Sequence, residues 1–161
     1  MSFFKRRQLL KAGARAPEFR VARLEGGEVS LAEIIASGPV ALAFFKITCP
    51  VCQFAFPFLE RLSPGTLPIY GISQNGTRDT ARFNREFGVT FPTLLDSEDQ
   101  EYPASNAFGI STVPTIFVVE RDGAIARVIE GWSKADIEWL GGRAGVAPFQ
   151  ASENVPAWKA G

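Results

Sequence analysis

Apolar runs of strand length alternate with amphipathic segments along most of the chain. PVALAFFK and LPIYGIS are nearly continuous apolar runs, which is typical of strands buried on both faces of a sheet. FRVARL alternates and indicates a strand with one exposed face. TRDTARFNREFG gathers its apolar residues on one side of a helix. The pattern predicts strands at residues 19–24, 39–46, 67–73 and 92–96, helices at residues 31–37, 50–62, 77–88 and 133–145, and a brief helical segment at residues 101–110.

Two further strands complete the pattern. TIFVVE and AIARVIEG flank Arg121-Asp122-Gly123, a turn signal that predicts an antiparallel hairpin. Strands that alternate with helices predict an α/β fold, with a central mixed β-sheet flanked by helices on both faces. We expect one domain at residues 17–147, preceded by a loosely ordered basic leader at residues 1–16 and followed by an irregular C-terminal tail at residues 148–161.

The composition narrows the functional classes. The chain has 161 residues, and its 17 basic and 17 acidic residues cancel, so no basic excess indicates nucleic-acid binding. Histidine is absent, which excludes histidine-based catalytic triads and imidazole metal ligands. No apolar run approaches the roughly 20 residues of a membrane helix, so no transmembrane segment is predicted.

The N-terminus contains Arg6-Arg7 followed by QLLK, much like the start of a twin-arginine export signal. Such a signal needs an apolar stretch of about 7–15 residues after its charges. Gly13, Arg15 and Pro17 interrupt the segment where that stretch would lie. We therefore expect a cytoplasmic protein.

Both cysteines lie in KITCPVCQ, where a buried strand is followed by a helix. Pro50 suits the first helical position, which places Cys49 at the helix N-terminus, where free N–H groups and the helix dipole favour a thiolate. Cys52 lies one turn further on the same face. The arrangement predicts that Cys49 attacks a disulfide and that Cys52 resolves the mixed disulfide.

Two other interpretations of the cysteine pair remain. A structural zinc site needs four ligands, and with two cysteines and no histidine it would require carboxylates or a second chain, so no metal is predicted. The pair can also consist of two inert thiols, although a CxxC placed between a strand and a helix seldom arises by chance.

Two segments carry a family resemblance. LAFFKITCPVCQFAFP resembles the active-site segment of thioredoxin-like proteins, especially the TlpA-type thiol-disulfide oxidoreductases. FGISTVPTIFVVERDG resembles the second signature of that family, and FGVTFPTLLDSEDQ is similar to an insert that TlpA-type proteins share with AhpC/TSA-like peroxiredoxins.

The resemblance implies a thioredoxin-like fold and thiol-disulfide exchange with protein substrates. Pro114 would be a cis-proline beside the cysteine pair, and Val113 would pair with an extended substrate chain. No bound cofactor is implied, because the redox-active disulfide Cys49–Cys52 carries the electrons. The partners would be protein thiols or disulfides and a dithiol electron partner.

The chain departs from the family pattern around the cysteines. Thr48 replaces the usual tryptophan, Ala43 the buried aspartate of true thioredoxins, and Ala55 the glutamate common in TlpA-type proteins. Lys46 replaces a small residue. Lys46 and Thr48 are therefore candidates for tuning the pKa of the thiols, and the proton acceptor for Cys52 is open.

These departures leave two alternative functions. A peroxiredoxin-like thiol peroxidase shares the fold, but its motif puts threonine or serine three residues before the reactive cysteine, where this chain has Lys46. The second alternative is a redox-inactive or sensing interaction module that keeps the thioredoxin fold without efficient turnover.

Overall fold

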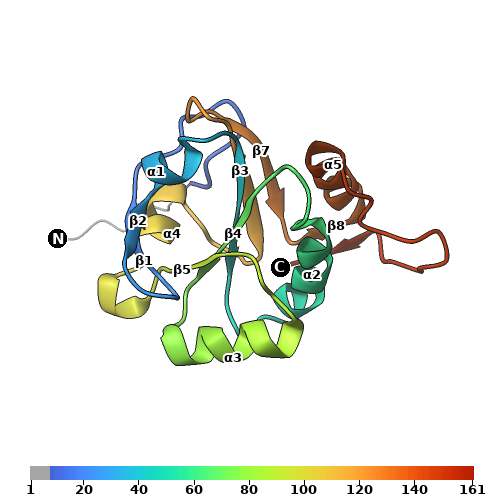
Figure 1. Cartoon of the computed structure of the whole chain (residues 1–161), viewed down its shortest axis with the longest axis horizontal. Coiled ribbons are helices and arrows are strands. Elements are labelled where there is room, and N and C mark those ends of the chain that lie inside the picture. The colour runs from blue at the N-terminus through green and yellow to red at the C-terminus, as the bar shows by residue number, and fades with distance from the viewer. Residues whose placement is uncertain (1–7) are drawn as a thin grey trace.

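The computed structural model describes residues 8–161, which form a mixed sheet between two layers of helices (Figure 1). The strands are β1 (Arg20–Arg23), β2 (Glu28–Ser30), β3 (Val40–Phe45), β4 (Ile69–Ser73), β5 (Thr93–Leu95), β6 (Thr115–Val119), β7 (Ile125–Glu130), β8 (Trp132–Ser133) and β9 (Trp158–Lys159). The helices are α1 (Leu31–Ile35), α2 (Pro50–Leu62), α3 (Thr77–Phe87), α4 (Pro103–Phe108) and α5 (Lys134–Ala144), with a short 3₁₀ helix, η1 (Glu98–Gln100).

Seven strands form the main sheet in the order β2-β1-β5-β4-β3-β6-β7. Strands β3, β4 and β5 are parallel, whereas β6 runs antiparallel to β3 and β7 antiparallel to β6. The predicted mixed sheet and the C-terminal hairpin are therefore confirmed. The pattern missed β2, whose three residues are too few to show a period and which pairs with β1.

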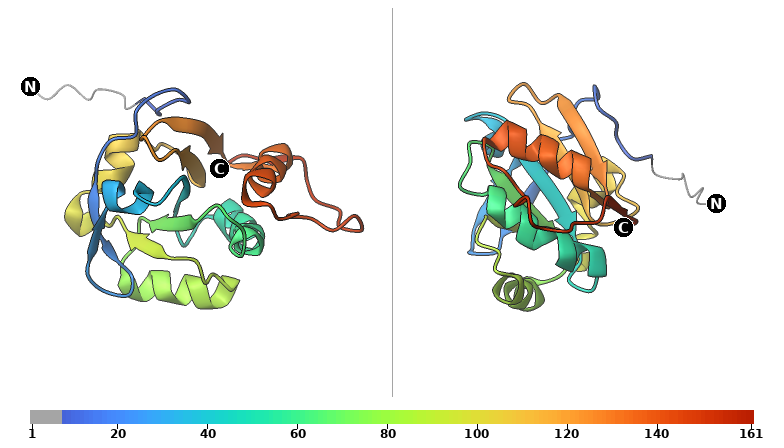
Figure 2. Two further views of the ribbon diagram at one scale, coloured as in Figure 1. Left: turned by 45° about the horizontal axis from the view of Figure 1, so that its top comes forward. Right: turned by 90° about the vertical axis from the view of Figure 1, so that its right-hand side faces the viewer.

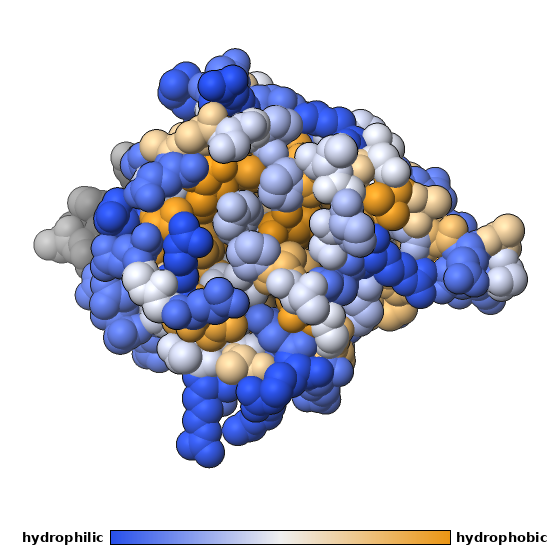
Figure 3. Space-filling view, viewed as in Figure 1, coloured by the Kyte–Doolittle hydropathy of each residue, from blue (hydrophilic) through white to orange (hydrophobic). Residues whose placement is uncertain are grey.

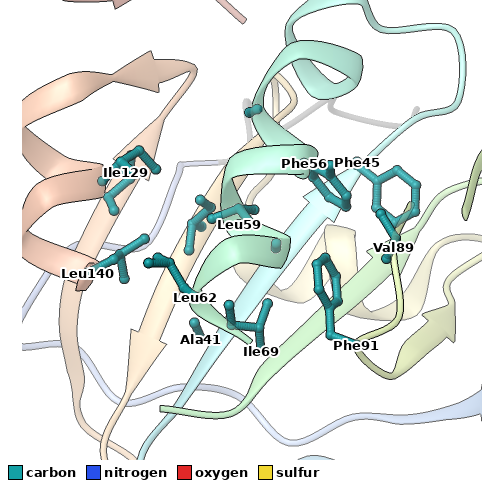
Figure 4. Packing of buried hydrophobic residues seen from close by; sticks show 14 of the residues in the cluster. Ala41, Phe45, Phe56, Leu59, Leu62, Ile69, Val89, Phe91, Ile129 and Leu140 are labelled. Atoms are coloured by element: carbon teal, nitrogen blue, oxygen red, sulfur yellow. The ribbon is translucent and has the colours of Figure 1, made fainter. Parts of the chain in front are cut away.

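The central strand β3 separates two hydrophobic clusters because its side chains alternate between the faces of the sheet. Ala41, Ala43 and Phe45 face a cluster with α2, α3 and α5, part of which Figure 4 shows. The residues between them face the other cluster, which contains residues of α1 and α4. The continuous apolar run at β3 thus reflects helices on both sides (Figure 2).

Helix α3 follows the predicted amphipathic pattern. Phe83 is buried, whereas Arg78, Arg82 and Arg85 are exposed. Figure 3 shows hydrophilic side chains along the lower rim of the molecule, where Figure 1 places α3. The helix ends at Gly88, whose φ of 69° is the left-handed conformation expected of a C-cap glycine.

Residues 8–16 and 148–161 are more ordered than the sequence indicates. Residues 8–16, expected to belong to a loosely ordered leader, form backbone hydrogen bonds with Phe108, Gly123 and Ile125, and a Cβ at Gly109 would collide with the backbone of Gln8. The tail at residues 148–161 contains β9, which pairs with β8. Long-range contacts order both segments. The sequence did not indicate this order, because a local pattern does not report such contacts.

Two expectations for the N-terminal part stay untested. Arg6 and Arg7 lie outside the described residues, and the cytoplasmic location stays a prediction. Within residues 8–161, no helix has both the length and the apolar character needed to cross a membrane.

Asp96 is a fully buried carboxylate that fixes α4 to the end of β5. One oxygen accepts a hydrogen bond from the Ala104 N–H at 2.8 Å. The other accepts from the Ser105 N–H at 2.7 Å and from the Ser105 hydroxyl at 2.5 Å. Ser105 in turn accepts a hydrogen bond from the Gln74 amide at 2.9 Å, which links α4 to the residue after β4.

Replacing Asp96 with alanine is expected to lower the free energy of unfolding by about 3 kcal/mol, because it leaves several buried donors without an acceptor. Denaturant unfolding followed by circular dichroism measures the change. Asp122→Ala is the control, since that exposed carboxylate accepts a single backbone hydrogen bond, from Ala124, and its loss should cost about 1 kcal/mol or less. Equal effects of the two substitutions would contradict the anchoring role of Asp96.

Candidate active site

The sheet topology brings three chain segments together at one end of the central strands. Strand β3 leads into Cys49, and its antiparallel neighbour β6 begins just after Pro114, with Phe44 opposite Thr115. Strand β7 pairs Glu130 with the same Thr115, so Gly131 follows at this end as well. The Gly131 N–H donates to the Pro114 carbonyl oxygen at 2.8 Å. A site at this end is therefore built by Cys49, Val113-Pro114 and Gly131.

Cys49 is the N-cap residue of α2, where the N–H groups of the first turn lack helical partners. Its Sγ accepts a hydrogen bond from the Cys52 N–H at 3.2 Å. When protonated, the same thiol donates to the Val113 carbonyl oxygen at 3.4 Å. Both cysteines are free, with Cys49 partly exposed and Cys52 buried. One accessible and one enclosed sulfur thus share the first turn of the helix.

The two thiols have opposite acidities. The pKa of Cys49 falls to about 6, chiefly because the Cys52 thiol donates a hydrogen bond to it. The backbone N–H groups of Cys52 and Val51 and the charge of Lys46 lower it further, against the effect of burial. Burial raises the pKa of Cys52 far above the ordinary value, and Cys49 raises it further. At neutral pH the site therefore pairs a thiolate with a protonated thiol.

Two polar side chains that the sequence reasoning missed hold the loop before Cys49. The Asn75 side-chain oxygen accepts from the Ile47 N–H at 3.0 Å, and the Gln53 amide donates to the Ile47 carbonyl oxygen at 2.9 Å. A signal for Asn75 existed, because it follows the strand predicted at residues 67–73, and parallel strands end at the same edge of a sheet. Gln53 shows no comparable signal, since most helices carry polar residues.

The other predicted site residues lie around this pair. The Val113–Pro114 peptide bond is cis, as the resemblance implies, and Val113 contacts Cys49 directly. Lys46 and Thr48 are exposed. Lys46 contributes to the low pKa of Cys49, whereas the role of Thr48 stays a prediction. In residues 8–161, no group of three or more cysteine or carboxylate side chains is arranged to hold a metal ion.

Residues 12–128 match the model of the AhpC/TSA family. The chain belongs to the AhpC/TSA family. The thiol-disulfide oxidoreductase ResA of Geobacillus thermodenitrificans is 29% identical over 143 residues, which cover 85% of this chain and 80% of that protein. ResA of Halalkalibacterium halodurans is 30% identical over 135 residues, which cover 81% of this chain and 74% of that protein.

Solved structures show the same fold. The thioredoxin domain of a thiol-disulfide oxidoreductase from Bacteroides vulgatus has a TM-score of 0.72 at 22% identity and covers 85% of this chain and 99% of that one. The peroxidoxin BcpB of Mycobacterium tuberculosis has a TM-score of 0.66 at 21% identity, with 84% of this chain and 94% of that one covered. The thioredoxin-like fold and the TlpA-type thiol-disulfide oxidoreductase, both predicted from the sequence, are confirmed.

The reaction of Cys49 with iodoacetamide is expected to follow a titration near pH 6, since the thiolate is the nucleophile. The rate should rise with pH, level off above about pH 7, and at pH 5 be about one tenth of the plateau. Cys52→Ala should raise the pKa of Cys49, whereas Cys52→Ser retains a hydrogen-bond donor and should raise it less. A midpoint of about 8.5 in the unaltered protein would refute the thiolate assignment.

Replacing Lys46 with methionine is expected to raise the pKa of Cys49 by less than Cys52→Ala does, because the lysine charge is a smaller contribution than the thiol hydrogen bond. The ultraviolet absorbance of the thiolate against pH gives the value. Lys46→Arg keeps the positive charge and is the matched control. An unchanged pKa in Lys46→Met would exclude Lys46 as a tuning residue.

Proposed function

We propose that this chain exchanges electrons with protein disulfides or dithiols through Cys49 and Cys52. The supporting observation is the contrast between a partly exposed thiolate and a buried protonated thiol in one helical turn. An accessible thiolate can attack a disulfide in solution. A buried thiol one turn away can reach only the Cys49 sulfur, once that sulfur is part of a mixed disulfide.

The first step forms a mixed disulfide. The Cys49 thiolate attacks one sulfur of the substrate disulfide, a new S–S bond forms, and the other substrate sulfur leaves as a thiolate. The backbone N–H of Cys52 lies at the attacking sulfur and holds it at the helix end. The substrate segment lies along Val113, beside the nucleophile.

The second step releases the substrate. Once Cys49 is in the mixed disulfide, the negative charge next to Cys52 is gone, which removes one of the causes of its raised pKa. Cys52 then loses its proton to the departing substrate thiolate and attacks the Cys49 sulfur. The products are the Cys49–Cys52 disulfide and a reduced substrate carrying two electrons and two protons, one of them taken from solvent. In the opposite direction, the same steps oxidise a substrate dithiol.

Neither step uses a bound cofactor, because the two sulfurs carry the electron pair and a second dithiol protein restores them. Lys46 and Val113 also line a polar pocket of about 220 Å³ together with Gln74 and Tyr102. This pocket adjoins the site, and polar side chains that flank the substrate cysteine would enter it.

Insulin reduction in the presence of dithiothreitol tests the proposal. The unaltered protein is expected to exceed the rate with dithiothreitol alone, and Cys49→Ser should abolish the excess because it removes the nucleophile. Without dithiothreitol, which would itself cleave the mixed disulfide, Cys52→Ser should accumulate a covalent complex with insulin, visible on a non-reducing gel, because resolution fails. A rate equal to that of free dithiothreitol would favour the redox-inactive module, and peroxide consumption without insulin reduction would favour the peroxidase.

A further inference from the structure

The C-terminal tail returns to the active-site end of the sheet. After α5 it loops outward and comes back toward the middle of the molecule (Figure 1). Strand β9 then pairs with β8, with Trp132 opposite Lys159. The Trp132 indole N–H donates to the Pro156 carbonyl oxygen at 2.6 Å, and the Lys134 N–H donates to the Ala157 carbonyl oxygen at 2.9 Å. Pairing with β8 directs the residues after β9 toward Gly131.

Residues 159–161 lie against the backbone on which a substrate chain is expected to dock. A Cβ at Gly131 would lie 2.5 Å from the Lys159 carbonyl oxygen and 2.9 Å from the Gly161 nitrogen. A Cβ at Gly161 would lie 2.5 Å from the Val113 carbonyl oxygen, the same atom that contacts Cys49 Sγ. The segment therefore touches two of the three chain segments that build the site.

The contacted backbone has unused hydrogen-bonding capacity. Within residues 8–161, the Val113 N–H has no hydrogen-bond partner, and Val113 is only partly buried. An unpaired N–H next to a reactive cysteine suits pairing with an incoming extended chain. Gly161 lies at the Val113 carbonyl oxygen, and no residue of the described tail bonds to the Val113 N–H, so the tail covers the groove and leaves this group unsatisfied.

Contacts further along the tail hold this segment in place. The Arg61 guanidinium pairs with both carboxylate oxygens of Glu153, at 2.7 and 2.9 Å, and donates to the Pro148 carbonyl oxygen at 2.9 Å. The Lys159 ammonium lies 5.2 Å from the ring centre of Phe54, a residue of the cysteine helix. Together with the pairing of β9 with β8, these contacts hold the segment without a hydrogen bond to the Val113 N–H.

We propose that residues 158–161 occupy the substrate groove formed by Val113 and Gly131, where a substrate chain would otherwise lie, and that an extended polypeptide segment must displace them before it reaches Cys49. This inference rests on the proposed function. The occupant also indicates which partner the groove fits. It is an extended segment with a glycine next to the Val113 carbonyl oxygen, because a Cβ on Gly161 would collide with that atom.

Deleting residues 158–161 tests the proposal, because it opens the groove while keeping the Pro156 and Glu153 contacts of the tail. We expect kcat/KM for insulin reduction to rise about tenfold, mainly through a lower KM, if the groove is open about one tenth of the time in the full chain. The rate with iodoacetamide, which is small enough to pass the tail, should stay within about twofold. That second rate also verifies that the shortened protein keeps its fold and its thiolate.

Two further measurements test whether residues 158–161 cover the groove or only stabilise the fold. Glu153→Gln weakens the contact with Arg61 without shortening the chain and should raise kcat/KM in the same direction by a smaller factor. Glu138→Gln, at an exposed position of α5, removes the same charge and should change nothing. A synthetic peptide of residues 158–161, added at millimolar concentration, should inhibit the shortened protein, because a tether of this kind acts at millimolar effective concentration.

A folded deletion variant whose kcat/KM is unchanged or lower would overturn the inference, as would a peptide that fails to inhibit. In that case Cys49→Ser would still abolish insulin reduction, and the proposed function would stand. If the full chain, the deletion variant and Cys49→Ser all fail to reduce insulin, the proposed function itself fails.

Discussion

The antiparallel pairing of β6 with β3 is the constraint on which the site depends. It places the start of β6 beside the end of β3, so the segment that carries Pro114 meets the segment that carries Cys49. Had β6 been parallel to β3, these segments would lie at opposite ends of the sheet. The β6–β7 hairpin then brings Gly131 to the same end. Thus the register of three adjacent strands, buried between two hydrophobic clusters, sets the distance between the nucleophile and the groove.

The chemistry follows from where α2 begins. Because Cys49 is the N-cap, its sulfur lies outside the helix and faces unpaired N–H groups, whereas Cys52 lies inside the first turn and points into the core. The same helix end therefore stabilises a negative charge on one sulfur and excludes water from the other. The division between nucleophile and resolving thiol is a consequence of helix geometry, and it requires no additional acid or base.

The sequence predicted those parts of the molecule whose cause is local. The apolar run at β3, the CxxC at a strand–helix boundary and the Val113-Pro114 signature each lie within a few residues. Asn75, Gln53 and the β8–β9 pair were missed, because their roles arise from contacts between segments that are distant in sequence. Strand β9 has two residues and no period, so its conformation comes from pairing and not from propensity.

The family residues that this chain lacks are not needed to produce the Cys49 thiolate. An inactive module would be expected to lose the conditions that produce a thiolate, yet the lowered pKa of Cys49 comes from the Cys52 thiol, two backbone N–H groups and Lys46. None of these depends on the residue types missing at positions 43, 48 and 55. Ala43 and Ala55 are buried among apolar neighbours, so these two positions contribute hydrophobic packing where relatives carry acidic side chains. Neither position carries a carboxylate that could accept a proton from Cys52, and in the exchange proposed above the substrate thiolate accepts it. Turnover would then depend on how closely the substrate docks along Val113, which makes access to that groove the step through which the rest of the chain can control the reaction.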